Sequence, residues 1–316
     1  MSDPFFQPVS ALEVPRYAGV PSFMRLPQIT PEHPRFADLD IALIGVPWDG
    51  GTTNRPGARH GPRGLRDAST MIRAMNPVTG VRPFEAANCA DLGDVGANPV
   101  SINAALDDIA RTYKGLAVAG KRVLTAGGDH LCTLPVLRGM AQNGPLGFVQ
   151  FDAHTDLFDG YFGGQKFTHG TPFRRAIEEG LIDPKRYIMV GIRGTAYNTD
   201  DVDWGEAQGV RIIRIEELMK RGIEDVMEEV RDVLGAQPAY ATFDIDVIDP
   251  AFAPGTGTPE IGGITSLQAQ MLIRGLTGTN LVGADVVEVA PPFDPSGTTA
   301  WVGVSMMFEL LCVMSA

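Results

Sequence analysis

The chain has 316 residues, of which 44% are hydrophobic and 20% charged, and its formal net charge at pH 7 is −12. This composition is ordinary for a globular enzyme, and a chain of this length can bury a substantial core as one large α/β domain or as two smaller domains. The acidic balance argues against nucleic acid or an anionic membrane as a partner, since both require clustered Lys and Arg. It is compatible with a cationic substrate.

Residues 1–38 are rich in proline and aromatic residues and show no clear period. We expect an ordered N-terminal arm here, and a candidate contact with a neighbouring subunit. The arm begins without a basic patch followed by an apolar run, so no signal peptide is visible.

The three cysteines, Cys89, Cys132 and Cys312, are scattered and lack metal-type spacing. They favour a reducing, cytoplasmic location.

From residue 39 onward, short β-rich runs alternate with amphipathic helices. Helical spacing marks residues 102–113 and 223–234, and Thr265 with Gln268 forms a capping box that begins a further helix. The last apolar stretch, from Trp301 to Ser315, is too short to span a bilayer and predicts a buried C-terminal helix. The predicted strands are Ile41–Val46, Arg122–Ala126, Gly147–Phe151, Tyr187–Ile192, Val210–Ile215, Tyr240–Phe243 and Val282–Val289. This alternation predicts an α/β fold with a parallel sheet covered on both faces, and the absence of a repeat or composition break favours one domain over residues 1–316.

Acidic and histidine residues follow three of the predicted strands. The motifs are Asp152-Ala-His154-Thr-Asp156, Asp244-Ile-Asp246 and Gly127-Gly128-Asp129-His130. A spacing of two residues places side chains on one face of an extended segment. Ligands bind beyond the carboxyl ends of the strands in open α/β sheets, and all three motifs fall there. We therefore expect these side chains to converge.

Such a cluster needs a counter-ion. A single Asp-x-His can equally be a strand-end turn or a helix cap, but four carboxylates brought together without a cation would raise one another's pKa. Two divalent cations would neutralise them, and mixed Asp/His ligation suits Mn²⁺, Ni²⁺ or another first-row metal. A lone catalytic Zn²⁺ needs only about three protein ligands. The residues thus favour a binuclear site.

The motifs resemble those of the ureohydrolase (arginase/agmatinase) family. The stretches that carry the resemblance are GGDH at 127–130, DAHTD at 152–156, THGTP at 168–172, FDIDVIDPAFAPGTGTPEIGG at 243–263 and DVVEVAPP at 285–292. PRYAGVPSFMRLP and GVPWDGGTTNRPGARHGPR look like the agmatinase-type branch, which includes bacterial guanidinopropionases and guanidinobutyrases. The resemblance runs from about residue 39 to the C-terminus. It implies a three-layer α/β/α fold with a mostly parallel, roughly eight-stranded sheet, two Mn²⁺ ions per subunit and a trimeric or hexameric homo-oligomer.

The resemblance also implies roles for individual residues. Asp152 and Asp244 would bridge the two metals, whose ligands would be His130, Asp152, Asp156 and Asp244 for one and Asp152, His154, Asp244 and Asp246 for the other. Asp156 would also carry a proton toward the leaving amine. Glu288 would pair with the substrate guanidinium, and His169 would act as a proton shuttle; the alternatives are a strand-end charge held by backbone amides and a structural loop histidine. Tyr161, in the loop 157–168 that joins a metal motif to His169, would line the substrate site, and Asp249 is the remaining acid at the same depth.

The implied reaction is hydrolysis of a small guanidino compound to urea and an amine. The stretch Tyr161-Phe162-Gly163 looks most like that of guanidinopropionases, and this resemblance favours a guanidino acid such as 3-guanidinopropionate or 4-guanidinobutyrate. Agmatine, and guanidine or biguanide-type compounds, are the alternative substrates. Two other kinds of protein stay open at this point: a catalytically silent ureohydrolase-like subunit, and a deacetylase-type amidohydrolase that uses one Zn²⁺.

Overall fold

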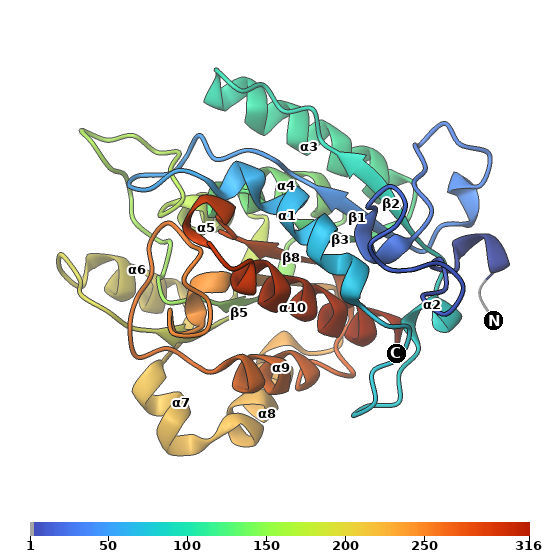
Figure 1. Ribbon diagram of the computed structural model, residues 1–316. Helices are drawn as coiled ribbons and strands as arrows, with labels where there is room; N and C mark the ends of the chain where they lie inside the picture. The colour runs from blue at the N-terminus through green and yellow to red at the C-terminus, as the bar shows by residue number, and fades with distance from the viewer. Residues whose placement is uncertain (1–2) are drawn as a thin grey trace.

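The computed structural model describes residues 3–316, and its centre is one sheet of eight strands (Figure 1). Every neighbouring pair is parallel, in the order β2-β1-β3-β8-β7-β4-β5-β6. The strands are β1 (Ile41–Gly45), β2 (Cys89–Asp94), β3 (Arg122–Ala126), β4 (Leu146–Phe151), β5 (Ile182–Ile192), β6 (Arg211–Arg214), β7 (Ala239–Asp244) and β8 (Leu281–Val287). The predicted parallel α/β sheet is confirmed.

Helices cover both faces of the sheet, and each face has its own hydrophobic core. Along β1, Ile41 and Leu43 belong to one core while Ala42 and Ile44 belong to the other, because successive strand side chains point to opposite faces. Residues of α1 and α7 to α10 enter the first core, and those of α3 to α5 enter the second. The helices are α1 (Gly61–Ala68), α2 (Pro83–Ala86), α3 (Ile102–Val118), α4 (Thr133–Met140), α5 (Pro172–Glu178), α6 (Asp200–Gln208), α7 (Ile215–Arg221), α8 (Ile223–Leu234), α9 (Ser266–Arg274) and α10 (Thr298–Ser315). The fold is therefore the expected three-layer α/β/α arrangement.

Strand β2 was not predicted, and β8 ends earlier than predicted. In β2 the apolar pattern is broken by Asp91, which is buried and forms an ion pair with Arg66 at 2.8 Å. In β8 the backbone turns into the left-handed region at Glu288, with φ of 60°. A non-glycine residue in that conformation cannot continue an extended strand, so β8 stops at Val287.

The C-terminal helix α10 is a core helix, as predicted, but it is longer than predicted. It begins at Thr298 and has 18 residues, which makes it the one helix within residues 3–316 that is long and apolar enough by composition to cross a membrane. Burial identifies its role, because 72% of it is buried inside the protein. Its thirteen buried residues include Glu309, which is held by Arg274.

The described part of the N-terminal arm, residues 3–38, packs partly on the rest of its own chain; residues 1 and 2 lie outside the described residues. Phe6 and Phe23 are fully buried, and the backbone N–H of Phe23 donates to Asp91 at 2.8 Å. Between these anchors, Leu12 and Tyr17 are 99% and 93% exposed. The arm is thus ordered by contacts within the chain, while the side chains of Leu12 and Tyr17 in its middle are exposed.

Candidate active site

Several strand ends meet over one cavity at the carboxyl edge of the sheet. His130 follows β3, Asp152 and His154 follow β4, Asp244 ends β7, and Glu288 follows β8. The cavity has a volume of about 430 Å³ and is lined in part by His154, Asp244 and Glu288. Strands β3 and β4 are consecutive in the chain but lie on opposite sides of the β8–β7 pair. The cavity therefore sits where the strand order reverses, which is the usual ligand position in an open α/β sheet.

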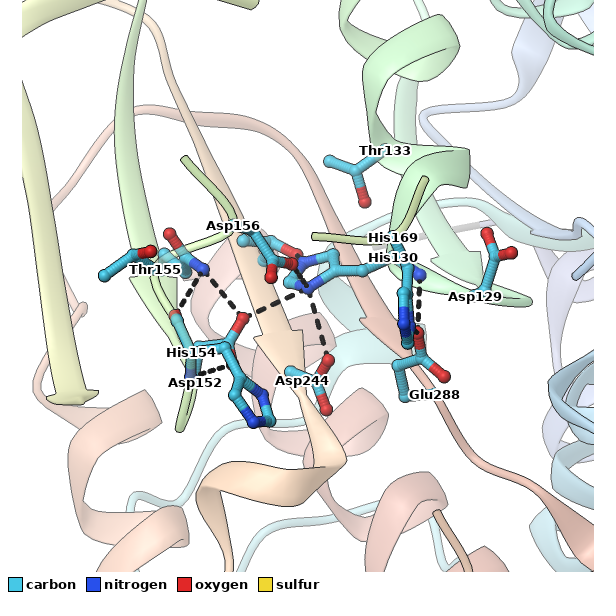
Figure 2. A network of polar contacts seen from close by, with 12 residues as sticks. Asp129, His130, Thr133, Asp152, His154, Thr155, Asp156, His169, Asp244 and Glu288 are labelled. Carbon is cyan, nitrogen blue, oxygen red and sulfur yellow. Dashed lines mark hydrogen bonds and ion pairs between the residues drawn. The ribbon is translucent and has the colours of Figure 1, made fainter. Parts of the chain in front are cut away.

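His130 faces three aspartates. Its Nδ1 lies 2.9 Å from Asp156 Oδ2, 3.1 Å from Asp152 Oδ2 and 3.2 Å from Asp244 Oδ2 (Figure 2). All four side chains are buried. The three motifs that the sequence predicted to converge do so at this atom.

A second group shares one aspartate with the first. His154 Nδ1 lies 3.0 Å from Asp246 Oδ2 and 3.6 Å from Asp152 Oδ1. One ligand atom from each of His130, Asp152 and Asp244 lies within 4.8 Å of the others, and the same holds for Asp152, His154 and Asp246. Asp152 belongs to both groups and contributes one oxygen to each side, as a bridging carboxylate does.

Hydrogen bonds on the far side of His130 decide which of its nitrogens faces the aspartates as an acceptor. Nε2 lies 2.8 Å from Thr242 Oγ1, and that hydroxyl donates to Asp285 Oδ1 at 2.5 Å. Since the threonine proton goes to Asp285, Thr242 accepts the Nε2 proton, and the ring is neutral once a cation has replaced the proton on Nδ1. Nδ1 then points its lone pair at three carboxylates.

That arrangement fits a pair of divalent cations. His130 Nδ1 and Asp246 Oδ2 are buried and have no hydrogen-bond partner within residues 3–316. Buried lone pairs facing anionic oxygens are unfavourable without a positive charge between them, and a cation in each Asp/His group would supply it in place of the retained protons. The donors, carboxylate oxygens and imidazole nitrogens, are those that first-row divalent metals accept.

The aspartates and histidines do not neutralise one another by themselves. Burial, together with the charge of Asp152, raises the pKa of Asp156 to about 6. Burial and the charges of Asp246 and Asp152 raise the pKa of Asp244 well above its usual value. Burial lowers the pKa of His130, but the three aspartates outweigh it and raise the pKa well above the ordinary histidine value. In the metal-free protein the cluster therefore retains protons that cations would replace.

Glu288 and His169 form a buried pair at the other side of the cavity. Glu288 Oε1 accepts the backbone N–H of His130 at 2.9 Å and lies 2.8 Å from His169 Nδ1. Burial lowers the pKa of His169, but the charge of Glu288 raises it to about 9. Nε2 accepts the backbone N–H of Thr53 at 3.2 Å and lies 2.8 Å from the Thr53 hydroxyl, so Nδ1 carries the proton that is donated to Glu288. No hydrogen bond within residues 3–316 uses Glu288 Oε2.

Backbone strain marks two of these residues. Within residues 3–316, five non-glycine residues have a positive φ, and they include Asp156 at 53° and Glu288 at 60°. Each conformation is costly and persists because surrounding contacts fix it, which is frequent where function requires a particular side-chain direction. Here the strain turns both carboxylates into the cavity.

Tyr161 and Asp249 have different surroundings. Tyr161 lines the cavity and packs against Phe158, with ring centroids 5.3 Å apart. Asp249 instead accepts backbone N–H groups of Ala251, Gly262 and Gly263 at 2.8–3.1 Å. Its carboxylate shapes the loop after β7, so it is not available as the reserve acid that the sequence suggested.

Sequence reasoning missed two supporting aspartates. Asp129 is fully buried and accepts the backbone N–H of Gly51 at 2.6 Å, which fixes the loop that carries Thr53. Asp285 lies beneath His130 and also accepts from Thr133 and Tyr240. Both belong to motifs quoted from the sequence, GGDH and DVVEV, but nothing in one sequence separates a cavity-facing acid from a buried supporting one.

A parallel α/β sheet with two overlapping Asp/His groups at its carboxyl edge defines the class of hydrolases that work with paired metal ions. The chain belongs to the arginase family, whose model matches residues 39–312. It is 54% identical to the guanidinopropionase of Pseudomonas aeruginosa over 315 residues, which are 100% of this chain and 98% of that protein. It is also 46% identical to the guanidinobutyrase of the same organism, over 98% of this chain and 96% of that protein.

The fold has the same relatives. The solved structure of proclavaminate amidino hydrolase from Streptomyces clavuligerus matches with a TM-score of 0.90 and 39% identity, over 96% of this chain and 99% of that chain. These similarities confirm the predicted family and fold. They also confirm the prediction that the chain is a hydrolase of this family.

Proposed function

We propose that the protein hydrolyses a guanidino acid, such as 3-guanidinopropionate or 4-guanidinobutyrate, to urea and an amine. The observation that carries this proposal is Glu288, a buried carboxylate at the cavity wall beside the two Asp/His groups, with Oε2 free of hydrogen bonds among residues 3–316. A guanidinium stays protonated at neutral pH and needs a buried carboxylate partner. The names of the similar guanidinopropionase and guanidinobutyrase support an acid tail.

Two divalent cations, Mn²⁺ in first place and Ni²⁺ as the alternative, complete the proposal. The residues that would hold one are His130, Asp152, Asp156 and Asp244, and those that would hold the other are Asp152, His154, Asp244 and Asp246. Four aspartates balance the charge of two such ions. When bound, the cations would make water a strong nucleophile at neutral pH, as a divalent metal lowers the pKa of water to about 7.

The remaining residues position the substrate and move protons. Glu288 holds the guanidinium so that its carbon faces the Asp/His groups, which is a positioning contribution. Asp156 accepts the proton that water loses on attack and carries it toward the leaving amine. His169, whose Nδ1 donates to Glu288, is the proton shuttle, and Tyr161 contacts the substrate from the loop 157–168.

The test is urea release from purified protein supplied with Mn²⁺ or Ni²⁺. The panel contains 3-guanidinopropionate, 4-guanidinobutyrate, agmatine, arginine, guanidine and a biguanide. We expect the guanidino acids to be hydrolysed with the highest kcat/KM. If no compound of the panel released urea, the result would favour a catalytically silent subunit. One metal ion per chain would favour the deacetylase-type enzyme that uses a single Zn²⁺.

We also propose a homo-oligomer, trimer or hexamer, in the cytoplasm. The exposed apolar residues of the arm, Leu12, Tyr17 and Val20, support an interface there. The C-terminal helix does not, because it is buried in the core of its own chain. Three free, buried cysteines are compatible with a reducing compartment. Light scattering at micromolar concentration should give the mass of three or six chains.

A further inference from the structure

The cavity has an outer part whose charges the proposed reaction does not use. Its wall is built from residues 193–199 after β5, the beginning of α6 and the end of β6. Two arginines, Arg193 and Arg214, line this wall. They are the cationic side chains through which the cavity can recognise the tail of a ligand.

The guanidinium of Arg193 already donates hydrogen bonds to backbone carbonyls of its own chain. Its Nη2 donates to the backbone carbonyls of Asp246 at 2.6 Å and Glu260 at 2.7 Å. Further bonds reach Val247 O at 3.1 Å and Ile261 O at 3.2 Å. These contacts tie the loop after β7 to the loop after β5, so the guanidinium cannot turn to a ligand without releasing both.

The side chain of Arg214, in contrast, is free to contact a ligand. Arg214 is the exposed last residue of β6, and its side chain makes no hydrogen bond or ion pair within residues 3–316. It pairs in register with Ile192 of β5, and β5 lies beside β4, whose end carries Asp152 and His154. Neighbouring strands are about 4.8 Å apart, so the Arg214 backbone lies roughly 10 Å across the sheet from these residues. A short guanidino acid and one arginine side chain together span that separation.

We propose that Arg214 binds the carboxylate of the substrate tail and selects guanidino acids over agmatine. This inference rests on the proposed function and names the residue that sets its substrate class. Arginine presents a planar fork that matches a carboxylate with two parallel hydrogen bonds. The ammonium tail of agmatine would meet a like charge at the same position.

Two acids share the outer wall and limit the alternatives. Asp201 is buried and accepts the Thr155 hydroxyl through Oδ2, while its Oδ1 has no hydrogen-bond partner among residues 3–316. Glu260 lies beside Gly194. If Asp201 or Glu260, rather than Arg214, bound the tail of the substrate, the enzyme would prefer a substrate with a cationic tail. The tail preference therefore separates the two readings of this wall.

The experiment compares Arg214→Gln and Arg214→Lys with wild type on 3-guanidinopropionate, 4-guanidinobutyrate and agmatine. The matched control is Arg73→Gln, which removes another exposed arginine whose side chain makes no hydrogen bond or ion pair in residues 3–316 and does not line the cavity. For Arg214→Gln we expect KM for the guanidino acids to rise at least tenfold with little change in kcat. Lysine should restore part of the loss, agmatine hydrolysis should stay equal or improve, and Arg73→Gln should behave as wild type.

The outcomes separate this inference from the proposed function. If wild type hydrolyses guanidino acids and Arg214→Gln has an unchanged KM for them, the role of Arg214 is wrong and the proposed function stands. A wild-type preference for agmatine also overturns the role of Arg214. If wild type releases no urea from any guanidino compound, the proposed function fails, and the inference fails with it. Equal melting temperatures of the variants exclude misfolding as the cause of a raised KM.

Discussion

The inner and outer parts of the cavity are built from different kinds of structure. The inner part lies at strand ends, where His130, Asp152 and Asp244 are buried and held by hydrogen bonds that reach into the sheet. The outer part is built mainly from the loop 193–199, with the beginning of α6 and the end of β6, and its residue Tyr197 is 86% exposed. The sheet thus fixes the reaction centre, and the loops are free to vary the ligand. Changes to the inner part should abolish chemistry, while changes to the outer part should alter selectivity.

The largest effect is expected from the shared aspartates. Asp152→Ala and Asp244→Ala should each reduce binding of both metal ions, because each carboxylate is proposed to bridge them. Activity should fall by on the order of 1,000-fold or more, since removal of a group essential to the reaction has effects of this size. Metal content measured by elemental analysis checks the reason for the loss.

The control for these variants is Asp107→Ala, which removes an exposed acid of α3 that has no hydrogen bond or ion pair in the described chain. It should keep two metal ions and full activity. If Asp152→Ala instead retained both ions, Asp152 would not bridge them. If wild type bound only one ion, the inner part of the cavity would not be a binuclear site.

The next largest effect concerns Glu288. Glu288→Gln keeps an oxygen that can accept the His130 N–H but removes the charge. Loss of a charge-assisted bond to a buried cation should cost about 2–5 kcal/mol, which is about 30-fold or more in kcat/KM. Metal content should remain at two ions because Glu288 is not proposed as a ligand. Full activity, or loss of metal, would contradict the role given to this residue.

A smaller effect is expected from Thr242, which connects His130 to Asp285. Thr242→Val removes the hydroxyl at nearly constant volume, and loss of such a supporting hydrogen bond typically weakens metal binding by about 10–100-fold. Thr242→Ser should restore it. Tyr240→Phe is the matched control, because it removes a hydrogen bond to the same Asp285 without touching His130. Competition with a chelator measures the affinities, and equal losses in both variants would show that Asp285 supports only the fold.

The metal residues were predictable because they lie two residues apart at strand ends, where the period of a strand aligns their side chains. The supporting network was not. Thr242 and Asp285 are separated by 43 residues and meet because β7 and β8 pair with these two residues opposite each other. Arg214 lay inside a predicted apolar strand, and only the order β4-β5-β6 brings it to the cavity. The sequence therefore predicts residues that are aligned locally, and strand order supplies the rest.

The smallest effect is a pH dependence of metal binding in the inner part. Metal ligands must lose their protons, so each proton released on binding changes the affinity about tenfold per pH unit. The pKa of His130 lies well above its ordinary value in the metal-free protein, so binding at pH 7 should release protons. The pKa of Asp156 is raised to about 6, so affinity should fall more steeply as the pH drops below 6. Asp156→Asn should lose this extra steepness but keep the proton release at pH 7. Calorimetry in buffers with different ionisation enthalpies counts the protons, and uptake in place of release would mean that the aspartate cluster does not bind the cations.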